Sequence, residues 1–217
     1  PDNCRSCGNR LAKGEEVLCL FCIHGLPRTN FHLHRNNSME KHFWARVPVK
    51  AASAFFYFQK GGKVQHLLHQ LKYKKKTEVG FKLGELYGSE LKNEFDFQHC
   101  DVIIPVPLHW KKQKQRGYNQ CDFFADGLSA SMEIAVQRST LFRNSMNESQ
   151  TRKNRFQRWE NVDRIFSVRN PSSVKNKNVL LVDDVMTTGS TLESCTTELL
   201  NAGVESICMA TIAVAER

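Results

Sequence analysis

The segment VLLVDDVMTTGST, Val179 to Thr191, restricts the fold more than any other part of the sequence. Four apolar residues run into the adjacent carboxylates of Asp183 and Asp184, and a loop of Thr, Gly and Ser follows. A short continuous apolar run is typical of a strand buried on both faces. Because the segment SCTTELLNAG comes next and ends at Gly203, the sequence predicts a strand, a loop and a helix in that order.

Other segments repeat this alternation of strand and helix. Apolar runs predict strands, and periodic patterns or helix-stop signals predict the helices between them. The expected strands are 51–58, 101–104, 178–184 and 206–215, and the expected helices are 64–73, 78–92, one fed by a loop within 116–132, and 194–203. Such alternation predicts an α/β fold with a mostly parallel sheet, whose ligands bind beyond the carboxyl ends of the strands.

Length, composition and charge exclude several classes of protein. A chain of 217 residues with 41% hydrophobic residues is long enough for one substantial core, so disorder is not expected. No run of about 18 apolar residues predicts a membrane-spanning helix, and the absence of an apolar signal core near residue 1 predicts a cytoplasmic protein. The net charge of +9 favours an anionic partner, such as a phosphorylated small molecule or a nucleic acid.

The two aspartates and the loop after them form the candidate ligand site. The first turn of a helix offers free N–H groups and a positive dipole end, which attract an anion. Hydroxyl groups add donors, and Gly189 allows close approach of the backbone; the loop residues are Thr187, Thr188, Gly189, Ser190 and Thr191. The two carboxylates are expected to lie about one sugar ring away from a phosphate bound by the loop, where they would bind vicinal hydroxyls or a metal ion. The pattern therefore favours a ribose 5-phosphate unit. A plain helix N-cap is the alternative, but capping needs only one such residue.

Four cysteines near the start of the sequence predict a metal site. Cys4 and Cys7 form one pair and Cys19 and Cys22 another, each with two residues between its members. Two such pairs can complete a closed tetrahedral Zn²⁺ site, which would be structural because no coordination position stays open. Two disulfides or four unrelated thiols are the alternatives. The other four cysteines are expected to be small buried residues: Cys100, Cys121, Cys195 and Cys208.

A polar, histidine-rich tract separates this module from the rest of the chain. His32, His34 and His42 would be able to extend the metal site, but four cysteines already satisfy zinc, so the tract is interpreted as a solvated linker. The predicted organisation is therefore a zinc ribbon with its linker at 1–46 and a main domain at 47–217.

Several segments of the sequence together resemble those of a known family. VLLVDDVMTTGST resembles the phosphoribosyl pyrophosphate motif of type I phosphoribosyltransferases. Together with the cysteine pairs, the segments HQLKYK (69–74), IPVPLH (104–109) and RGYNQ (116–120) are similar to the ComF family, whose competence-associated proteins join a zinc module to a phosphoribosyltransferase domain. The resemblance covers nearly the whole chain in the same order.

The resemblance implies roles for individual residues. Asp183 and Asp184 would hold the ribose hydroxyls, and Thr187 to Thr191 the 5-phosphate, with Mg²⁺ accompanying the diphosphate. The turn after the strand at 101–104 corresponds to the pyrophosphate loop, with cations nearby to neutralise the diphosphate; the implied residues are Pro107, Leu108, His109, Lys72 and Arg116.

The segment 141–166 corresponds to the family's flexible hood. Five positions match the family pattern, at Arg143, Gln150, Arg158, Asn161 and Phe166. Two depart from it, with Asn147 at a threonine position and Lys153 at an apolar one. A basic loop with Phe156 and Trp159 would be able to clamp a phosphate or stack a base; the alternative, favoured for Trp159, is a solvated helix buried on one aromatic side.

Two functions of different classes follow from these residues. The first is an enzyme that transfers ribose 5-phosphate from phosphoribosyl pyrophosphate to an acceptor that the sequence does not name. The second is a competence factor that binds single-stranded DNA and uses the fold as a ligand-responsive scaffold, since such binding combines positive charge with stacking. A ligand-sensing regulator is a third possibility, and partners among the competence machinery follow from the resemblance alone.

Overall fold

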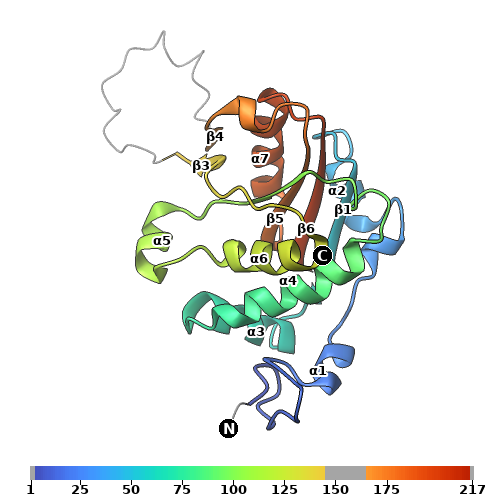
Figure 1. Cartoon of the computed structure of the whole chain (residues 1–217), viewed down its shortest axis with the longest axis vertical. Helices are drawn as coiled ribbons and strands as arrows, with labels where there is room; N and C mark the ends of the chain where they lie inside the picture. Colours follow the sequence, from blue (N-terminus) through green and yellow to red (C-terminus); the bar gives the residue numbers. More distant parts are fainter. Residues whose placement is uncertain (1–2, 145–164, 216–217) are drawn as a thin grey trace.

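The computed structural model describes residues 3–144 and 165–215. Its centre is a four-stranded parallel sheet with the order β1-β6-β5-β2 (Figure 1). The strands are β1 (Ala51–Phe58), β2 (Val102–Pro105), β5 (Asn178–Met186) and β6 (Ser206–Ala215). Two of them, β1 and β6, have the predicted bounds. All four strands are largely buried, as expected for a parallel sheet covered on both faces.

One face of the sheet is covered by three helices. These are α3 (Lys63–Tyr73), α4 (Thr77–Leu91) and α6 (Gln120–Met132). Their apolar residues form one cluster with the alternate strand residues Leu180 and Val182. Helices α4 and α6 lie backbone to backbone, because a Cβ atom added at Gly127 would be 2.0 Å from the carbonyl oxygen of Phe81. This contact fixes the position of α6, whose first turn reaches the end of β5.

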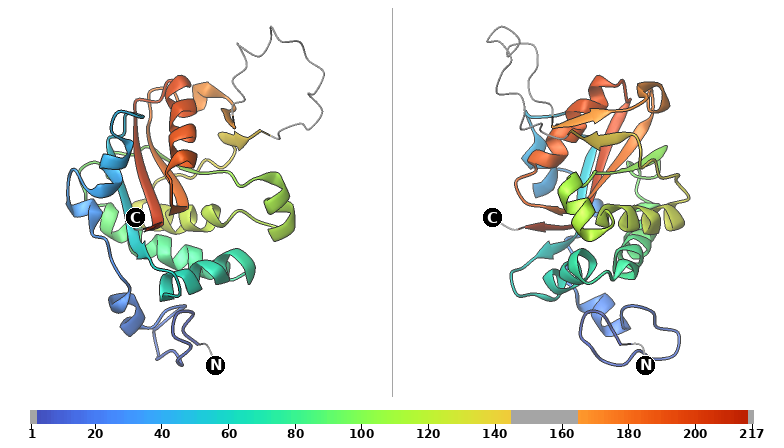
Figure 2. Two further views of the ribbon diagram at one scale, coloured as in Figure 1. Left: turned by 180° about the vertical axis from the view of Figure 1, so that it is seen from behind. Right: turned by 90° about the vertical axis from the view of Figure 1, so that its left-hand side faces the viewer.

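The other face is covered by α7 (Ser190–Asn201) and α2 (Ser38–Phe43). Leu181 and Val179 of β5 point to this side and pack in a second cluster with Met39 and Phe43. Figure 2 shows the sheet between the two layers, with the N-terminal residues beyond α3 at one end of the molecule. The fold is therefore α/β with a parallel sheet, as predicted.

The tract predicted to be a solvated linker is instead largely packed against the sheet. The 3₁₀ helix η1 (Phe31–Leu33) and α2 precede β1, and Met39 and Phe43 are each only 1% exposed. The backbone beside Thr29 also pairs with β1, where Thr29 N–H donates to the carbonyl of Phe55. The solvated-linker interpretation is wrong for these residues, while the boundary near residue 47 stays a prediction.

Several short elements complete the structure. Helix α1 (Leu20–Gly25) carries Cys22, α5 (Trp110–Arg116) precedes α6, and the 3₁₀ helix η2 (Pro171–Ser173) precedes β5. A separate antiparallel pair, β3 (Leu141–Arg143) and β4 (Phe166–Val168), was not predicted. No helix within residues 3–144 and 165–215 is long and apolar enough to cross a membrane.

Candidate functional site

Two loops meet at the carboxyl edge of the sheet. Strands β2 and β5 are parallel neighbours, with Pro105 opposite Val182, so the residues that follow each of them lie side by side. Asp183 and Asp184 follow Val182, and the turn from Val106 to His109 follows Pro105. The nitrogen of Val106 still donates to the carbonyl of Val182, 2.9 Å away, which ties the turn to the strand that carries the carboxylates.

Asp184 lies in a network of cationic and amide donors. Its Oδ2 atom is 2.8 Å from Lys72 Nζ and 2.8 Å from Gln120 Nε2. Arg116 in turn donates to Oε1 of Gln120. The structure therefore links both predicted cations, Lys72 and Arg116, to the acidic pair. Gln120 is buried at the first turn of α6 and is a site residue that the sequence reasoning did not single out, although it ends the RGYNQ segment.

Asp183 has a different environment. Its Oδ1 atom accepts the backbone N–H of Asp184 at 2.8 Å and the thiol of Cys121 at 3.3 Å. Burial, together with the negative charge of Asp184, raises the pKa of Asp183 to about 7. The two adjacent carboxylates therefore repel each other in the fold, and Lys72, which pairs with Asp184, offsets this repulsion only weakly at Asp183.

Cys121 is buried, as predicted, but it is more than a small apolar residue. Burial and the neighbouring carboxylates hold the pKa of its thiol well above the ordinary value, so the thiol keeps its proton and donates it to Asp183. The ligand atoms of Cys121, Asp183 and Asp184 lie within 4.8 Å of one another. The two carboxylates are hard oxygen ligands suited to Mg²⁺, whereas a protonated thiol is not.

The hydroxyl-rich loop turns directly into α7. The helix begins at Ser190, four residues earlier than predicted, and Gly189 is its N-cap with a φ of 72°. Thr187, Thr188 and Ser190 are exposed, Thr191 is half-buried, and the hydroxyls of Thr188 and Ser190 are 2.8 Å apart. Free N–H groups and accessible hydroxyls therefore gather at one helix N-terminus, which is the arrangement that favours a phosphate group.

His42 of α2 also contacts this loop. Its Nε2 atom is 2.8 Å from the carbonyl oxygen of Thr188. A Cβ atom at position 189 would lie 2.7 Å from the same nitrogen, so Gly189 is required for this approach as well as for its positive φ. The sequence placed His42 in a linker, and nothing in the local pattern relates it to a loop 146 residues later.

The turn after β2 is held by side chains of the segment that follows. Asn119 Nδ2 donates to the carbonyl of Val106 at 3.0 Å. His109 caps α5, where its Nδ1 accepts the N–H of Lys111. Pro107 and Leu108 are half-buried beside it. The assignment of this turn to a diphosphate stays a prediction.

The four N-terminal cysteines come together as predicted. Their sulfur atoms lie within 4.8 Å of one another, and those of Cys7 and Cys19 are 3.8 Å apart. Burial acts to raise the pKa of Cys4, but the N–H groups of Cys19, Cys7 and Ser6 outweigh it and lower that pKa to about 6. A thiolate at Cys4 and four converging sulfurs fit a tetrahedral Zn²⁺ ion.

Only the two ends of the predicted hood lie within the described residues. Arg143 of β3 pairs with Phe166 of β4, and its guanidinium lies 5.3 Å from the centre of that ring. The two ends of the predicted hood therefore lie side by side as an antiparallel pair of strands. The remaining assignments lie outside the described residues, namely Asn147, Gln150, Lys153, Phe156, Arg158, Trp159 and Asn161.

Comparison with known proteins agrees with this geometry. The family profile "Phosphoribosyl transferase domain" matches residues 116–217, the part of the chain that holds α6, the acidic pair and the hydroxyl loop. "DNA utilization protein YhgH" of Escherichia coli O6:H1 is 29% identical over 208 residues, which are 94% of this chain and 86% of that protein. "Competence protein ComFC" of Bacillus subtilis is 25% identical over 207 residues, 92% of this chain and 78% of that protein.

Among solved structures, the allosteric regulatory enzyme of purine biosynthesis is similar over 66% of this chain and 30% of its own, with 20% identity and a TM-score of 0.46. The parallel sheet, the four-cysteine cluster, the matching phosphoribosyltransferase profile and the near full-length competence and DNA-utilization relatives lead to one conclusion. The chain has a type I phosphoribosyltransferase fold with an N-terminal four-cysteine cluster and is similar to competence and DNA-utilization proteins, which is the organisation that the resemblance to the ComF family implies.

Proposed function

We propose that the protein binds phosphoribosyl pyrophosphate with Mg²⁺ and transfers the phosphoribosyl group to an acceptor. The observation that carries this proposal is the meeting of an acidic pair, half-buried at Asp183 and buried at Asp184, with an exposed hydroxyl loop at the N-terminus of α7. The loop supplies donors for the 5-phosphate, and Asp183 and Asp184 supply acceptors for the two ribose hydroxyls. Names of the relatives point to competence and DNA utilization as the biological setting.

The residues around the acidic pair would prepare it for a sugar. Lys72 forms an ion pair with Asp184, and this carboxylate would accept a hydrogen bond from a ribose hydroxyl. Gln120 fixes the orientation of the same carboxylate, and Arg116 fixes Gln120. These contacts hold the ribose in one position, which is the part of catalysis that positioning contributes.

The reaction would then be a substitution at the anomeric carbon. The bond from that carbon to the diphosphate oxygen breaks with its electron pair, and a bond to the acceptor's nucleophilic atom forms as that atom loses a proton. Bound Mg²⁺ supplies positive charge to the leaving diphosphate. The turn from Val106 to His109 lies beside the acidic pair, and the backbone N–H groups of Leu108 and His109 would be its donors to the same group, because Val106 N–H bonds to Val182 and Pro107 has none.

Calorimetric titration of phosphoribosyl pyrophosphate in the presence of MgCl₂ tests the proposal. We expect saturable binding by the zinc-replete protein and loss of that binding when Asp183→Ala and Asp184→Ala are combined. A binding wild type then allows acceptors to be screened by pyrophosphate release. If the folded wild type gives no binding heat, the proposed function is wrong.

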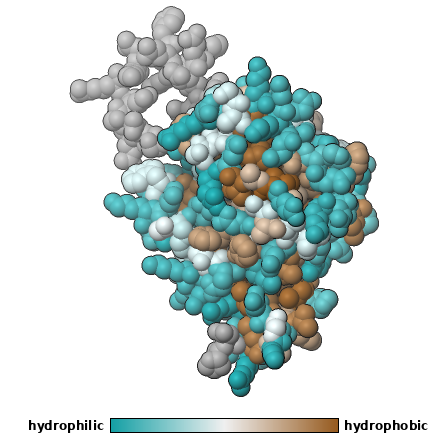
Figure 3. Space-filling view, viewed as in Figure 1, coloured by the Kyte–Doolittle hydropathy of each residue, from teal (hydrophilic) through white to brown (hydrophobic). Residues whose placement is uncertain are grey.

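A specific surface favours a second candidate, the binding of single-stranded DNA. Helix α5 has no buried residue, and its Trp110 is 50% exposed; Tyr73 at the end of α3 is 62% exposed. Lys111 Nζ lies 5.6 Å from the Trp110 ring centre, and the Arg116 guanidinium 5.1 Å from that of Tyr73. The side of the molecule that carries α5 is mostly hydrophilic (Figure 3). Exposed rings among cations suit stacked bases and a phosphate backbone.

Fluorescence anisotropy with a labelled oligothymidylate tests this second candidate. We expect binding that weakens as salt rises, and that weakens further when Trp110→Ala and Tyr73→Ala are combined. Trp44→Ala is the matched control, because Trp44 is 58% exposed but follows α2 rather than lying in this surface. Equal loss in the control, or salt-independent binding, would contradict the assignment of the surface.

A further inference from the structure

His42 lies outside the residues matched by the phosphoribosyltransferase profile, yet it contacts the hydroxyl-rich loop of the candidate site. It belongs to α2, which precedes the first strand of the sheet, whereas the loop follows β5. Its Nε2 atom is 2.8 Å from the carbonyl oxygen of Thr188. A carbonyl oxygen can only accept, so Nε2 carries the hydrogen of this bond and the imidazole is the donor. A side chain from a distant segment therefore holds the loop.

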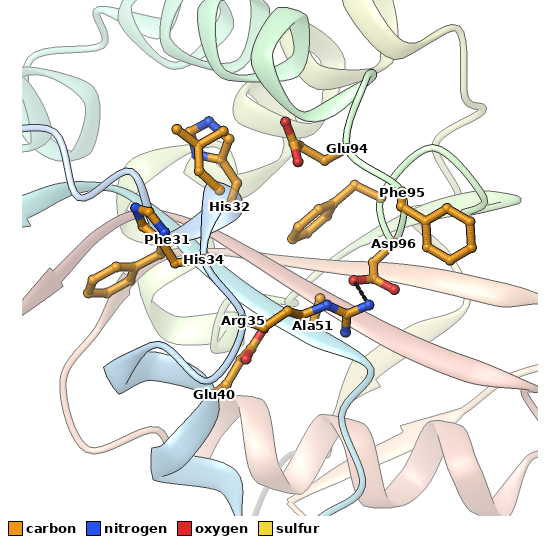
Figure 4. Close-up of a pocket in the computed structure, with 11 residues that line it drawn as sticks. Phe31, His32, His34, Arg35, Glu40, Ala51, Glu94, Phe95 and Asp96 are labelled. Atoms are coloured by element: carbon orange, nitrogen blue, oxygen red, sulfur yellow. Dashed lines mark ion pairs between the residues drawn. The ribbon is translucent and has the colours of Figure 1, made fainter.

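Contacts with the sheet fix the position of α2. The helix has only six residues, so its position depends on packing rather than on its own hydrogen bonds. Its N-cap Asn37 donates through Nδ2 to the carbonyl of Ala52 in β1, 2.9 Å away. Glu40 of α2 and Ala51, the first residue of β1, line the same small pocket (Figure 4). The sheet therefore sets the point from which His42 reaches the loop.

The imidazole lies directly against the backbone of the loop. A Cβ atom added at Gly189 would be 2.7 Å from Nε2 and 2.8 Å from Cδ2 of His42. On the other side, the ring of Phe43 packs edge-on against the imidazole, with 5.3 Å between ring centres and 85° between ring planes. Phe43 itself is only 1% exposed. The bond to Thr188 is thus part of a packed contact and not an isolated hydrogen bond at the surface.

This bond fixes which way the peptide between Thr188 and Gly189 faces. In a planar trans peptide the C=O and N–H groups point in opposite directions, and no cis peptide occurs among the described residues. Because the Thr188 carbonyl faces His42, the N–H of Gly189 faces the other way. Within residues 3–144 and 165–215, no backbone N–H donates to that carbonyl, so the imidazole is what holds it.

The orientation of this peptide affects how the loop meets a phosphate group. Glycine adopts positive and negative φ about equally readily, so a peptide beside Gly189 can turn over at little cost. A turned peptide would place the partly negative carbonyl oxygen on the side that the N–H now faces. It would then oppose the positive field that the N-terminus of α7 offers to an anion. Donation from the imidazole also polarises the peptide, which makes its N–H a stronger donor.

We infer that His42 is a positioning residue for the 5-phosphate group. By holding the Thr188 carbonyl, it keeps the loop in the orientation that presents donors to the phosphate and turns the carbonyl away from it. His42 approaches the peptide from the side opposite the N–H, so it acts through the loop and not as a phosphate ligand. This inference rests on the proposed function, because it assigns a residue to the 5-phosphate part of that site.

Titration calorimetry of phosphoribosyl pyrophosphate with MgCl₂ into the full, zinc-replete chain tests this role. His42→Leu should weaken binding by about three- to tenfold, which is the effect of one hydrogen bond. His66→Leu is the matched control, because it removes an exposed histidine of α3 on the other face of the sheet, and it should bind as the wild type does. Equal affinities of His42→Leu and a binding wild type would overturn the inference and leave the proposed function standing. A wild type that does not bind would overturn both.

Two amide variants separate the hydrogen bond from a general effect on folding. The amide nitrogen of His42→Gln can reach as far as Nε2 of the imidazole, whereas that of His42→Asn is one methylene shorter. His42→Gln should therefore bind within about twofold of the wild type, and His42→Asn should keep the loss of about three- to tenfold. A folding defect would affect the two amides alike. If His42→Asn binds as tightly as His42→Gln, the donor to Thr188 does not position the loop and the inference is wrong.

Discussion

The two adjacent aspartates should respond to the same substitution with opposite changes in stability. Asn has nearly the shape of Asp, and Asp183→Asn keeps an oxygen for the Cys121 thiol and the Asp184 N–H. It also removes a charge that burial and Asp184 disfavour in the folded state. Asp184→Asn removes a charge that Lys72 stabilises. We therefore expect Asp183→Asn to stabilise the ligand-free protein and Asp184→Asn to destabilise it.

The pKa of Asp183 sets the size and the pH dependence of the first effect. An unfolded aspartate has a pKa of about 3.9 and each pKa unit is about 1.36 kcal/mol, so a native pKa of about 7 corresponds to at most about 4 kcal/mol. Because the folded pKa is raised, the penalty is absent below pH 4, grows as pH rises from 4 to 7, and is complete above 7. Asp183 is half-buried, so we expect a gain of about 1–3 kcal/mol for Asp183→Asn at pH 8, and almost none at pH 4.5.

Asp184→Asn should have the opposite sign for a related reason. The substitution leaves the ammonium of Lys72, whose side chain is 22% exposed, without its carboxylate. Loss of a partly buried partner costs about 1–3 kcal/mol, and relief of the repulsion on Asp183 offsets part of it. The net effect should be a loss of about 1 kcal/mol at pH 8.

Urea unfolding of the three proteins at pH 5, 6, 7 and 8, with zinc present, measures these differences. The gain of Asp183→Asn over wild type should increase across this series. A gain that does not change with pH would refute the reasoning, because it would show that Asp183 is ionised in the folded protein at every pH. A stabilised Asp184→Asn would equally contradict the role given to Lys72.

Three other outcomes are expected from the structure. Gly127→Ala should lower the free energy of unfolding by about 2 kcal/mol or more, because its Cβ would lie 2.0 Å from a backbone oxygen. Gly80→Ala meets only side-chain atoms, the nearest at 3.1 Å, and should lower it by less than about 1 kcal/mol. Thermal unfolding compares the two variants, and equal losses would contradict the backbone contact. Cys22→Ser should reduce the amount of zinc bound per chain below one ion, and should increase hydrogen exchange near residues 4–22 but not in β5. Cys195→Ser is the control, and it should keep its zinc. Affinity for phosphoribosyl pyrophosphate should fall as pH drops below 7, by up to about tenfold per pH unit, because protonation removes the charge that makes Asp183 a strong acceptor for a hydroxyl. Calorimetry at pH 6 and 8 measures this change, and a flat profile would contradict it.

The parallel sheet could be predicted because its strands have a strong local pattern. The apolar runs of β1 and β6 end where polar residues begin, and their bounds agree with the structure. The start of α7 was harder to predict from the sequence, because Ser190 and Thr191 resemble loop residues and the apolar period begins only with Leu192. Helix α5 buries no residue, so no hydrophobic period exists from which to predict it.

Some residues of the candidate site could likewise be predicted from the sequence, and others could not. The acidic pair and the hydroxyl loop are contiguous in sequence, so their chemistry could be inferred from one segment. Gln120 contacts Asp184 across 64 residues, and His42 contacts Thr188 across 146. Such contacts depend on the packing of α6 and α2 against the sheet, and one sequence contains no local signal for them.

The contact between His42 and Thr188 also has a practical consequence for working with fragments of this chain. A fragment that begins at Val47 would contain every residue matched by the phosphoribosyltransferase profile and the whole four-stranded sheet. It would nevertheless lack His42, Met39 and Phe43, and with them the bond to the Thr188 carbonyl and part of the core beneath α7. A piece of the chain for ligand-binding work therefore needs to begin no later than Pro27, where the backbone first pairs with β1, and it keeps the core intact only if it also contains Leu18, Cys22 and Leu26.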